Sequence, residues 1–353
     1  MLFIIVHELG NIIKFFLFFF LFSIFKYVYI SLILLVIIVI LLFVISTAFL
    51  TLLERKKISS FQHRRGPNKT GALGILQPFS DAFKLIFKEI IIPRNSIFIV
   101  FILSPILSSI FGFLNWAVFS FSGLFSILSN INLTLFLIFA ISSLHVYSII
   151  LAGWSSNSRY SFLGAVRSSA QLIAYDIALS VIILNIILIT KSFNLITIIL
   201  LQQICGSFLF FYFFIFLLFF ICCIAETNRH PFDLPEAESE LVSGYNVEYS
   251  SINFALFFLG EYTSILFMCG LIANLFLSGW LGYFYYIKIL LLLVIFVFLR
   301  AELPRYRYDQ LMDLGWKVIL PFSLFLFFFN FIILFISSGL SLDYCFNIKI
   351  III

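Results

Sequence analysis

The densest cluster of ionisable side chains lies between residues 226 and 248, where six acids fall within 23 residues. It follows an apolar stretch, 204–225, that carries no charge. If Pro235 starts a helical turn, Glu236 and Glu240 stand on one side of it at i and i+4, where like charges repel. One of the two then holds its proton more tightly, and such a pair can store and pass protons near neutral pH. A solvated loop is the plainer interpretation, but interleaved aromatic side chains favour burial between helices or under a partner.

Two further acids lie inside apolar stretches. Asp176 and Glu261 each fall roughly 13 to 15 Å along a predicted membrane-spanning helix, by the rise of about 1.5 Å per residue. A carboxylate at that depth costs roughly 2.5–3.5 kcal/mol on the insertion scale, so it must face a polar interior. One interpretation is a structural hydrogen bond between helices, for example to Tyr175 or Thr263. The other is a proton or ion relay, because intramembrane acids commonly mark such paths.

A basic segment, 54–69, follows the first apolar stretch and holds Arg55, Arg64 and Arg65. Behind it, residues 73–90 place apolar side chains on one helical face and polar ones on another, which predicts an amphipathic helix lying in the membrane interface. In one interpretation the cations rest among lipid phosphates. In the other, they present positive charge and hydrogen-bond donors to a partner or to the head group of a ligand.

These groups must be positioned by helices that cross a membrane. Apolar residues make up 63% of the 353 and charged residues 10%, and the mean hydropathy is +1.20. An ordinary soluble domain has about 25% charged residues, so a soluble globular enzyme and a disordered protein are both excluded. Continuous rather than alternating apolar runs argue against a membrane β-barrel. We predict an all-α polytopic membrane protein with about eight transmembrane helices, since each crossing needs about 20 apolar residues, and with the interfacial amphipathic helix after the first.

The predicted spans form one transmembrane domain over 28–338, between an N-terminal extension, 1–27, and a C-terminal tail, 339–353. They cover residues 28–53, 97–117, 131–152, 172–190, 204–225, 251–278, 284–299 and 318–338.

The loops on one face hold 16 of the 21 Lys and Arg residues and 12 of the 16 acids. These odd-numbered loops are 54–96, 153–171, 226–250 and 300–317. By the positive-inside rule, that face looks into the cytoplasm or the mitochondrial matrix. Phe supplies 50 residues, more than packing requires. We interpret this excess as the codon bias of an AT-rich genome, which suggests an organelle-encoded protein.

No motif for a metal, a nucleotide or a nucleic acid stands out. The five cysteines and four histidines show no metal-ligand spacing, and no Gly-rich phosphate loop occurs. Nucleic-acid binding would need a soluble basic face, which the sequence lacks. We therefore predict no cofactor bound by this chain alone, no metal and no catalytic residue of its own, with any redox carriers on other chains.

Five stretches together resemble a single family, subunit 1 of proton-pumping NADH:ubiquinone oxidoreductase, or respiratory complex I. They are ERKKISSFQHRRGPN, LQPFSDAFKLIFKE, SSNSRYSFLGAVRSSAQLIAYDIALS, AETNRHPFDLPEAESELVSGYNVEYSSINFALFFLGEY and RAELPRYRYDQLMDLGWK. The fourth is specific to that family and to its close relatives, the membrane subunits of complex-I-like hydrogenases. Three departures are Asp176, where the family pattern has Glu, Pro235 before the acidic run, and residues 1–27, which have no counterpart in the family.

The resemblance implies a subunit at the heel of the membrane arm that forms part of the ubiquinone chamber and starts the acidic path for proton translocation. Its partners would be the quinone-site redox-arm subunits, which with other subunits carry FMN and the iron–sulfur clusters, the small membrane-arm subunits and membrane lipids. It would lie in the mitochondrial inner membrane with its odd-numbered loops in the matrix. Motif position makes Arg55, Arg64, Phe232 and Asp233 candidates for quinone binding. The candidates for the proton path are Asp176, Glu226, Glu236, Glu238, Glu240 and Glu261.

Two alternatives to an enzyme subunit come from other classes. A stand-alone transporter or antiporter would use Asp176 and Glu261, although the acids gather on one face and no internal repeat is visible. A purely structural anchor for a soluble complex would carry inert acids. Activity in liposomes without partners would favour the transporter, and intact activity after Glu-to-Gln changes would favour the anchor.

Overall fold

A computed structural model describes residues 37, 40–117, 119, 132–233, 244–279 and 283–339. By its internal contacts the chain divides into residues 1–48 and residues 49–353. In the first unit, residues 40–48 are helical, and in the second, helix occupies residues 49–61 and most of the described residues after them. Several predictions lie outside the described residues: the extension 1–27, most of the first span, the tail from residue 340, and Glu236, Glu238 and Glu240.

The described residues contain helices and turns and no strand, which confirms the all-α polytopic class. Six stretches are long and apolar enough to cross a membrane, and α6 and α8 are shorter apolar helices. After residue 61 the helices are α2 (Gln77–Phe87), α3 (Phe98–Ala117), α4 (Thr134–Ser155), α5 (Arg159–Thr190), α6 (Leu195–Cys205), α7 (Phe208–Phe211), α8 (Phe213–Glu226), α10 (Ser251–Phe276), α11 (Tyr283–Glu302), α12 (Tyr308–Asp313) and α13 (Leu320–Gly339), with 3-10 turns η1 (Ala72–Gly74) and η2 (Gly244–Asn246) and a π-helical segment, η3 (Leu314–Ile319).

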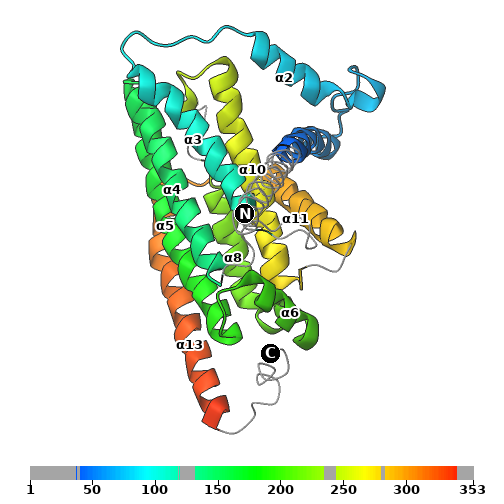
Figure 1. Ribbon diagram of the computed structural model, residues 1–353, viewed down its shortest axis with the longest axis vertical. Helices are drawn as coiled ribbons and strands as arrows, with labels where there is room; N and C mark the ends of the chain where they lie inside the picture. The colour runs from blue at the N-terminus through cyan, green and yellow to red at the C-terminus, as the bar shows by residue number, and fades with distance from the viewer. Residues whose placement is uncertain are drawn as a thin grey trace, which may run out of the picture. The chain divides into compact units, whose positions relative to one another are not determined.

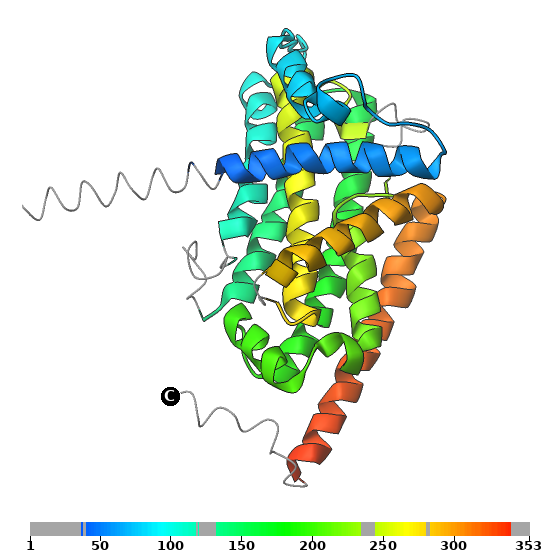
Figure 2. The same ribbon diagram turned by 90° about the vertical axis from the view of Figure 1, so that its right-hand side faces the viewer.

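The long helices of the second unit pack side by side in the order α10, α3, α4, α5, with α8 and α13 against α5 (Figure 1). Figure 2 shows α11 crossing α10 at a steep angle. Small residues permit the close approach of α3 and α10. A Cβ atom added to Gly112 would lie 2.3 Å from the Oγ1 of Thr263, and one on Gly260 would lie 3.1 Å from the backbone oxygen of Ser108. Such small-residue contacts are typical of helices packed within a membrane.

Two predicted loops are shorter in the structure than expected, because the neighbouring helices extend past the apolar stretches into charged residues. The loop predicted over 153–171 is reduced to residues 156–158, since α5 already begins at Arg159. Arg167 therefore lies on a helix, with its guanidinium 5.7 Å from the ring centroid of Tyr308. Likewise, the loop predicted over 300–317 contains only five non-helical residues, 303–307. Hydropathy marks where the apolar stretch ends, whereas a helix can extend beyond it.

The span predicted over 204–225 is interrupted in the structure. Gly206, at a φ of 94°, follows the end of α6, and Tyr212 separates the four-residue α7 from α8. α8 itself has 14 residues. The interruption is surrounded by apolar side chains, so hydropathy alone could not locate it. Six other predicted spans overlap the long helices, and the remaining one, the first, lies mostly outside the described residues.

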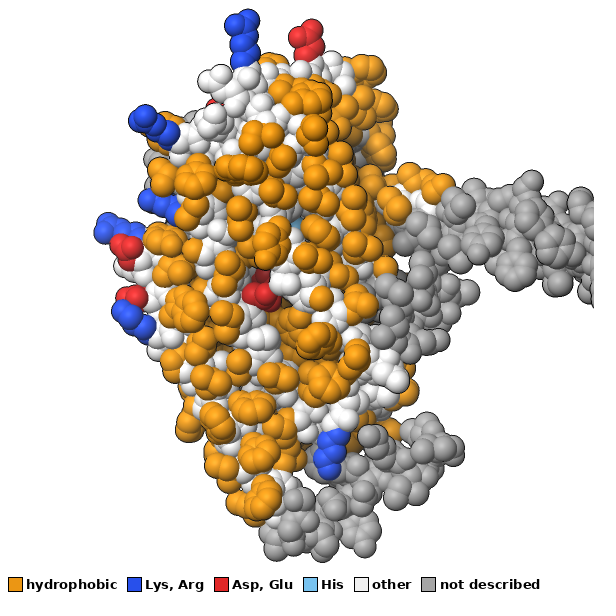
Figure 3. All heavy atoms as spheres, turned by 60° about the vertical axis from the view of Figure 1, so that its left-hand side comes forward, with side chains coloured by type: hydrophobic (Ala, Val, Ile, Leu, Met, Phe, Trp, Pro, Cys, Tyr) orange, Lys and Arg blue, Asp and Glu red, His pale blue; other side chains and the backbone are white. Residues whose placement is uncertain are grey.

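The predicted amphipathic helix is present as α2, shorter at both ends than the 73–90 stretch, with a proline in its first turn. Its apolar side chains Phe79, Phe83 and Ile86 are exposed, as an interfacial helix requires. On the face of the molecule shown in Figure 3, apolar side chains predominate, and most charged ones gather along one edge and at one end.

Candidate functional site

A buried carboxylate, Glu54, collects three partners from separate parts of the chain. Tyr262 of α10 donates a 2.7 Å hydrogen bond to its Oε2, and Arg300 of α11 donates to its Oε1. Arg229, three residues after α8, places an Nη1 atom 3.5 Å from the same Oε1. The Arg229 guanidinium also lies 4.5 Å from the centroid of the Tyr262 ring. We call these four residues the Glu54 network.

The charge of Glu54 is maintained by its neighbours. The residue is only 6% exposed, and burial by itself would raise the pKa of its carboxyl. The guanidinium groups of Arg229 and Arg300, with the hydrogen bond from Tyr262, outweigh burial and bring the pKa of Glu54 below its usual value. A carboxylate compensated in this way stays ionised.

A second polar group forms around Asp233. The Oδ2 of Asp233 lies 3.3 Å from the Nε2 of His230 and 3.4 Å from the Nη2 of Arg305. That Nη2 is in turn 3.1 Å from the same Nε2. We call these three side chains the Asp233 triangle. Asp233 is 5% exposed, whereas His230 and Arg305 keep about a quarter of their side chains accessible, 23% and 27%.

The two groups are built on the same pair of segments. Residues 229–233, after α8, contribute Arg229 to the Glu54 network and His230 and Asp233 to the triangle. Residues 300–305, at the end of α11, contribute Arg300 to the network and Arg305 to the triangle. The backbone nitrogen of Tyr306 donates to the oxygen of Pro231 at 3.2 Å and ties the two segments together.

Aromatic rings flank the triangle. Phe232 is 4% exposed and stacks on Tyr306, with ring centroids 5.7 Å apart and planes 16° apart. On another side it meets Tyr175 of α5 at 5.6 Å. The side-chain nitrogen of Gln171 donates to the backbone oxygens of Phe232 and Ala225, both at 2.9 Å, and so fixes the turn after α8. The site thus combines the ion-paired carboxylate of Asp233 with the flat, apolar rings of Phe232 and Tyr306.

Two acids face each other between α5 and α8. Asp176 of α5 and Glu226 at the end of α8 are close enough for their side chains to interact. One oxygen of each, Oδ1 of Asp176 and Oε2 of Glu226, is buried and finds no hydrogen-bond partner among the described residues. Asp176 is the only acid in α3, α4, α5 and α13.

The remaining intramembrane acid, Glu261, is 8% exposed and accepts a 2.5 Å hydrogen bond from the hydroxyl of Tyr245. The expected partners of the two intramembrane acids were Tyr175 and Thr263. Instead, Tyr175 donates to the backbone oxygen of Leu311, and Thr263 to that of Gly260.

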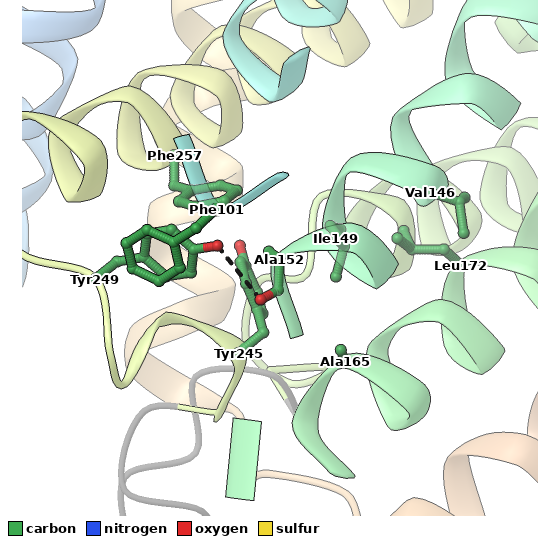
Figure 4. Close-up of a cluster of buried hydrophobic side chains, with 9 residues drawn as sticks. All are labelled: Phe101, Val146, Ile149, Ala152, Ala165, Leu172, Tyr245, Tyr249 and Phe257. Atoms are coloured by element: carbon green, nitrogen blue, oxygen red, sulfur yellow. Dashed lines mark hydrogen bonds between the residues drawn. The ribbon is translucent and has the colours of Figure 1, made fainter. Parts of the chain in front are cut away.

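Tyr245 belongs to a buried aromatic cluster with Phe101, Tyr249 and Phe257 (Figure 4). Phe101 and Tyr249 stack with centroids 4.1 Å apart. The Tyr249 hydroxyl contacts the backbone oxygen of Ala152, drawn as a dashed line in Figure 4. The cluster holds the Tyr245 ring rigidly and thereby directs its hydroxyl at the carboxyl of Glu261.

The basic candidates stand apart from these acids. Arg55 has 54% of its side chain exposed and forms a 2.6 Å ion pair with Asp81 of α2. Arg64 is exposed. In the described part of the chain neither arginine forms an ion pair with Asp233. Of the four quinone-binding candidates, Phe232 and Asp233 are therefore buried within the site, whereas Arg55 and Arg64 are exposed on the basic segment.

Sequence reasoning missed the residues that pair with the buried charges. Glu54 and Arg300 lie 246 positions apart, so no local spacing connects them. The available signal was position: Glu54 and Arg300 are the first charged residues after apolar stretches, and Arg229 follows Glu226 just after another.

The fold and site define a polytopic helical membrane protein with compensated charges at the helix ends and further acids between its helices. Residues 33–331 match the family described as NADH dehydrogenase. The chain is 48% identical over 297 residues to a subunit of the NADH-quinone oxidoreductase of Rickettsia typhi, covering 80% of this chain and 87% of the relative. It is 46% identical over 314 residues to NADH-ubiquinone oxidoreductase chain 1 of Cyanidium caldarium, covering 85% and 89%.

This chain belongs to the NADH dehydrogenase family, which confirms the resemblance seen in the sequence. By their names, its relatives are subunits of NADH-quinone and NADH-ubiquinone oxidoreductases.

Proposed function

We propose that this chain is the heel subunit of the membrane arm of mitochondrial NADH:ubiquinone oxidoreductase. There it forms part of the ubiquinone-binding chamber and of the acidic path that couples quinone reduction to proton translocation. FMN and the iron–sulfur clusters sit on partner subunits, and ubiquinone is the substrate. The quinone-site redox-arm subunits contact its matrix-side loops, and the small membrane-arm subunits contact its helices. The chain lies in the inner membrane with its odd-numbered loops in the matrix.

The observation that carries the proposal is that an ion-paired carboxylate, Asp233, lies beside stacked aromatic rings. A quinone head group is a flat ring with two carbonyl oxygens, so it needs an aromatic surface and hydrogen-bond donors together. Phe232 and Tyr306 supply stacked rings, and Arg305 and His230 supply nitrogen atoms at the Asp233 carboxylate. The exposed cations Arg55 and Arg64 lie on the basic segment, where they can meet the quinone at the mouth of the chamber.

The acidic path is proposed to run through the acids that the helices bury. Asp176 and Glu226 interact and each has a buried oxygen without a partner among the described residues, which suits groups that take up and release protons. Glu261 accepts a hydrogen bond from the hydroxyl of Tyr245. Glu236, Glu238 and Glu240 follow the site in sequence and are proposed to continue the path.

Photo-crosslinking of the assembled complex with a quinone analogue, followed by peptide mapping, tests the proposal. We expect labelling within residues 54–90 or 226–250, reduced by excess quinone. Labelling confined to lipid-facing helices, or unaffected by excess quinone, would contradict it.

A variant pair adds a kinetic test. Asp233→Asn removes a buried charge of the site, whereas Asp313→Asn removes an exposed acid that pairs with Lys317 on the same helical stretch. We expect the KM for a short-chain quinone to rise in the first variant and to stay unchanged in the second. Equal KM values in both variants would argue against a role for Asp233 in the site.

A further inference from the structure

The amphipathic helix α2 lacks the local features that usually close the end of a helix. The last four carbonyl oxygens of any α-helix have no partner within the helix. Many helices satisfy them with a residue in the left-handed conformation just after the last turn. Here Lys88, the residue after α2, is extended, with φ −74° and ψ 139°, and none of residues 88–92 has a positive φ. A donor for these carbonyls must therefore come from another part of the chain or from water.

Ser251, the first residue of α10, supplies this donor. Its Oγ atom lies 2.9 Å from the backbone oxygen of Leu85, one of the four open carbonyls of α2, and 2.6 Å from that of Lys88. A serine hydroxyl has a single hydrogen, which the two oxygens share in a three-centre bond. The partners lie 166 and 163 positions away in the sequence. The end of α2 is thus closed by a tertiary contact with α10.

The neighbouring serine holds the chain just beyond α2. The backbone nitrogen of Ile91 donates to the Oγ of Ser250 at 3.1 Å. Ser251 therefore serves carbonyl acceptors and Ser250 serves an amide donor, on the two sides of the point where the helix ends. We call Ser250 and Ser251 the serine clamp. It reinforces the packing of α2 against α10 (Figure 1).

The serine clamp is itself held in a fixed position. Two residues earlier, the Tyr249 ring stacks on Phe101, and its hydroxyl lies 2.9 Å from the Oγ of Ser104 and 3.2 Å from that of Ser155. Ser251 is 2% exposed and has a φ of 60°, in the left-handed region that residues other than glycine rarely adopt. Such a conformation persists only where the surroundings determine it. The bonds from Ser251 to the end of α2 are part of those surroundings.

We propose that Ser251 is a positioning residue that fixes the end of α2 against α10. Its effect reaches the basic segment because the start of α2 holds the connection 62–76, which carries Arg64. There Gln77 accepts a 2.8 Å hydrogen bond from the hydroxyl of Thr70. The consequence for quinone rests on the proposed function: with α2 fixed, Arg64 is kept in one place at the mouth of the chamber.

Amide hydrogen exchange of the assembled complex, read by mass spectrometry, measures the position of α2 without quinone. In Ser251→Ala we expect the amides of residues 84–87 to exchange about fivefold faster than in the wild type, the size expected for the loss of one hydrogen bond. The amides of residues 55–61, beyond the connection, should exchange as in the wild type and serve as the internal reference.

Two further variants assign the change. Ser251→Gly also removes the hydroxyl, but glycine adopts a φ of 60° without strain, so it should accelerate exchange as much as Ser251→Ala. Ser96→Ala is the matched control, because the Ser96 hydroxyl donates to Pro93 within its own segment, and it should follow the wild type. Wild-type exchange in Ser251→Ala would overturn the proposal. So would an acceleration that Ser251→Gly abolishes or that Ser96→Ala reproduces.

The kinetic constants for a short-chain quinone separate this role from the proposed function. In Ser251→Ala we expect the KM to rise about threefold at an unchanged kcat, because a group that binds quinone is displaced and none that transfers protons is removed. Faster exchange with a wild-type KM would keep Ser251 as the residue that fixes α2 and would remove Arg64 from quinone binding. A lower kcat at an unchanged KM would contradict a role confined to positioning the mouth.

Discussion

Arg300 donates a hydrogen bond to Glu54 across 246 positions of sequence and thereby joins the end of α11 to the helical segment 49–61. Arg229 and Tyr262 complete the shell around the same carboxylate. Four segments that are remote in sequence therefore meet at one buried charge. Removing one member of such a group leaves the others without compensation. Substitutions in the Glu54 network therefore measure how strongly the helix ends depend on each other for stability.

Glu54→Gln should destabilise the subunit. The amide keeps the shape but leaves Arg229 and Arg300 without their counter-charge, at a cost of about 2–3 kcal/mol, less than for a fully buried pair because Arg300 is partly exposed. The yield and thermal stability of the assembled complex measure this loss. Arg300→Gln in the Glu54→Gln background should restore part of it, and additive losses would show that the two residues do not interact.

The stability that Glu54 contributes should depend on pH in a defined direction. The pKa of Glu54 is lower in the folded protein than its usual value of 4.5. The contribution is therefore fully present above about pH 4.5 and is lost as the pH falls through the lower, folded value. Rates of irreversible inactivation at pH 6 and pH 4 should diverge more in the wild type than in Glu54→Gln. The same ratio of rates in both proteins would assign acid sensitivity to other groups.

Hydropathy and motif order were sufficient to predict the helical class, the amphipathic α2 and the burial of Phe232, Asp233 and Glu261. Each of these depends on a local property, such as an apolar run or a charge within one. The break between α6 and α8 could not be predicted in this way, because Gly206 and Tyr212 are embedded in apolar sequence.

The pairing of charges that are distant in the chain is a second feature that could not be predicted from a single sequence. Arg229 was visible as a lone cation in an acidic stretch, and Glu54 as an acid in a basic one, but their contact depends on the packing of α8 and α10 around the segment 49–61. The same holds for His230 and Arg305, whose contact follows from the tie between residues 231 and 306.

Glu261→Gln should leave assembly intact and reduce quinone-linked proton pumping by about tenfold or more, since a relay needs a group that ionises. Tyr245→Phe removes the hydroxyl that donates to Glu261 while keeping the ring in its aromatic cluster. We expect it to reduce pumping less than Glu261→Gln. Pumping is measured as pH-dependent fluorescence quenching in reconstituted vesicles.

Tyr249→Phe is the matched control for this pair, because its hydroxyl contacts Ser104 and Ser155 rather than an acid. It should cost about 1 kcal/mol of stability and leave pumping unchanged. If Glu261→Gln pumped normally, the acid would be structural, and if Tyr249→Phe reduced pumping as much as Tyr245→Phe, the loss would reflect general packing.

Arg55→Ala should raise the KM for a short-chain quinone by about threefold to tenfold, the loss of about 0.7–1.4 kcal/mol expected for one hydrogen bond from an exposed side chain. The change also breaks the ion pair with Asp81, so a higher KM alone does not separate binding from the position of α2. Asp81→Asn breaks the same pair and retains the cation. We therefore expect KM to rise in Arg55→Ala and to stay near the wild-type value in Asp81→Asn. Equal increases would mean that the pair acts by holding α2 in place, and an unchanged KM in Arg55→Ala would remove that residue from the quinone site.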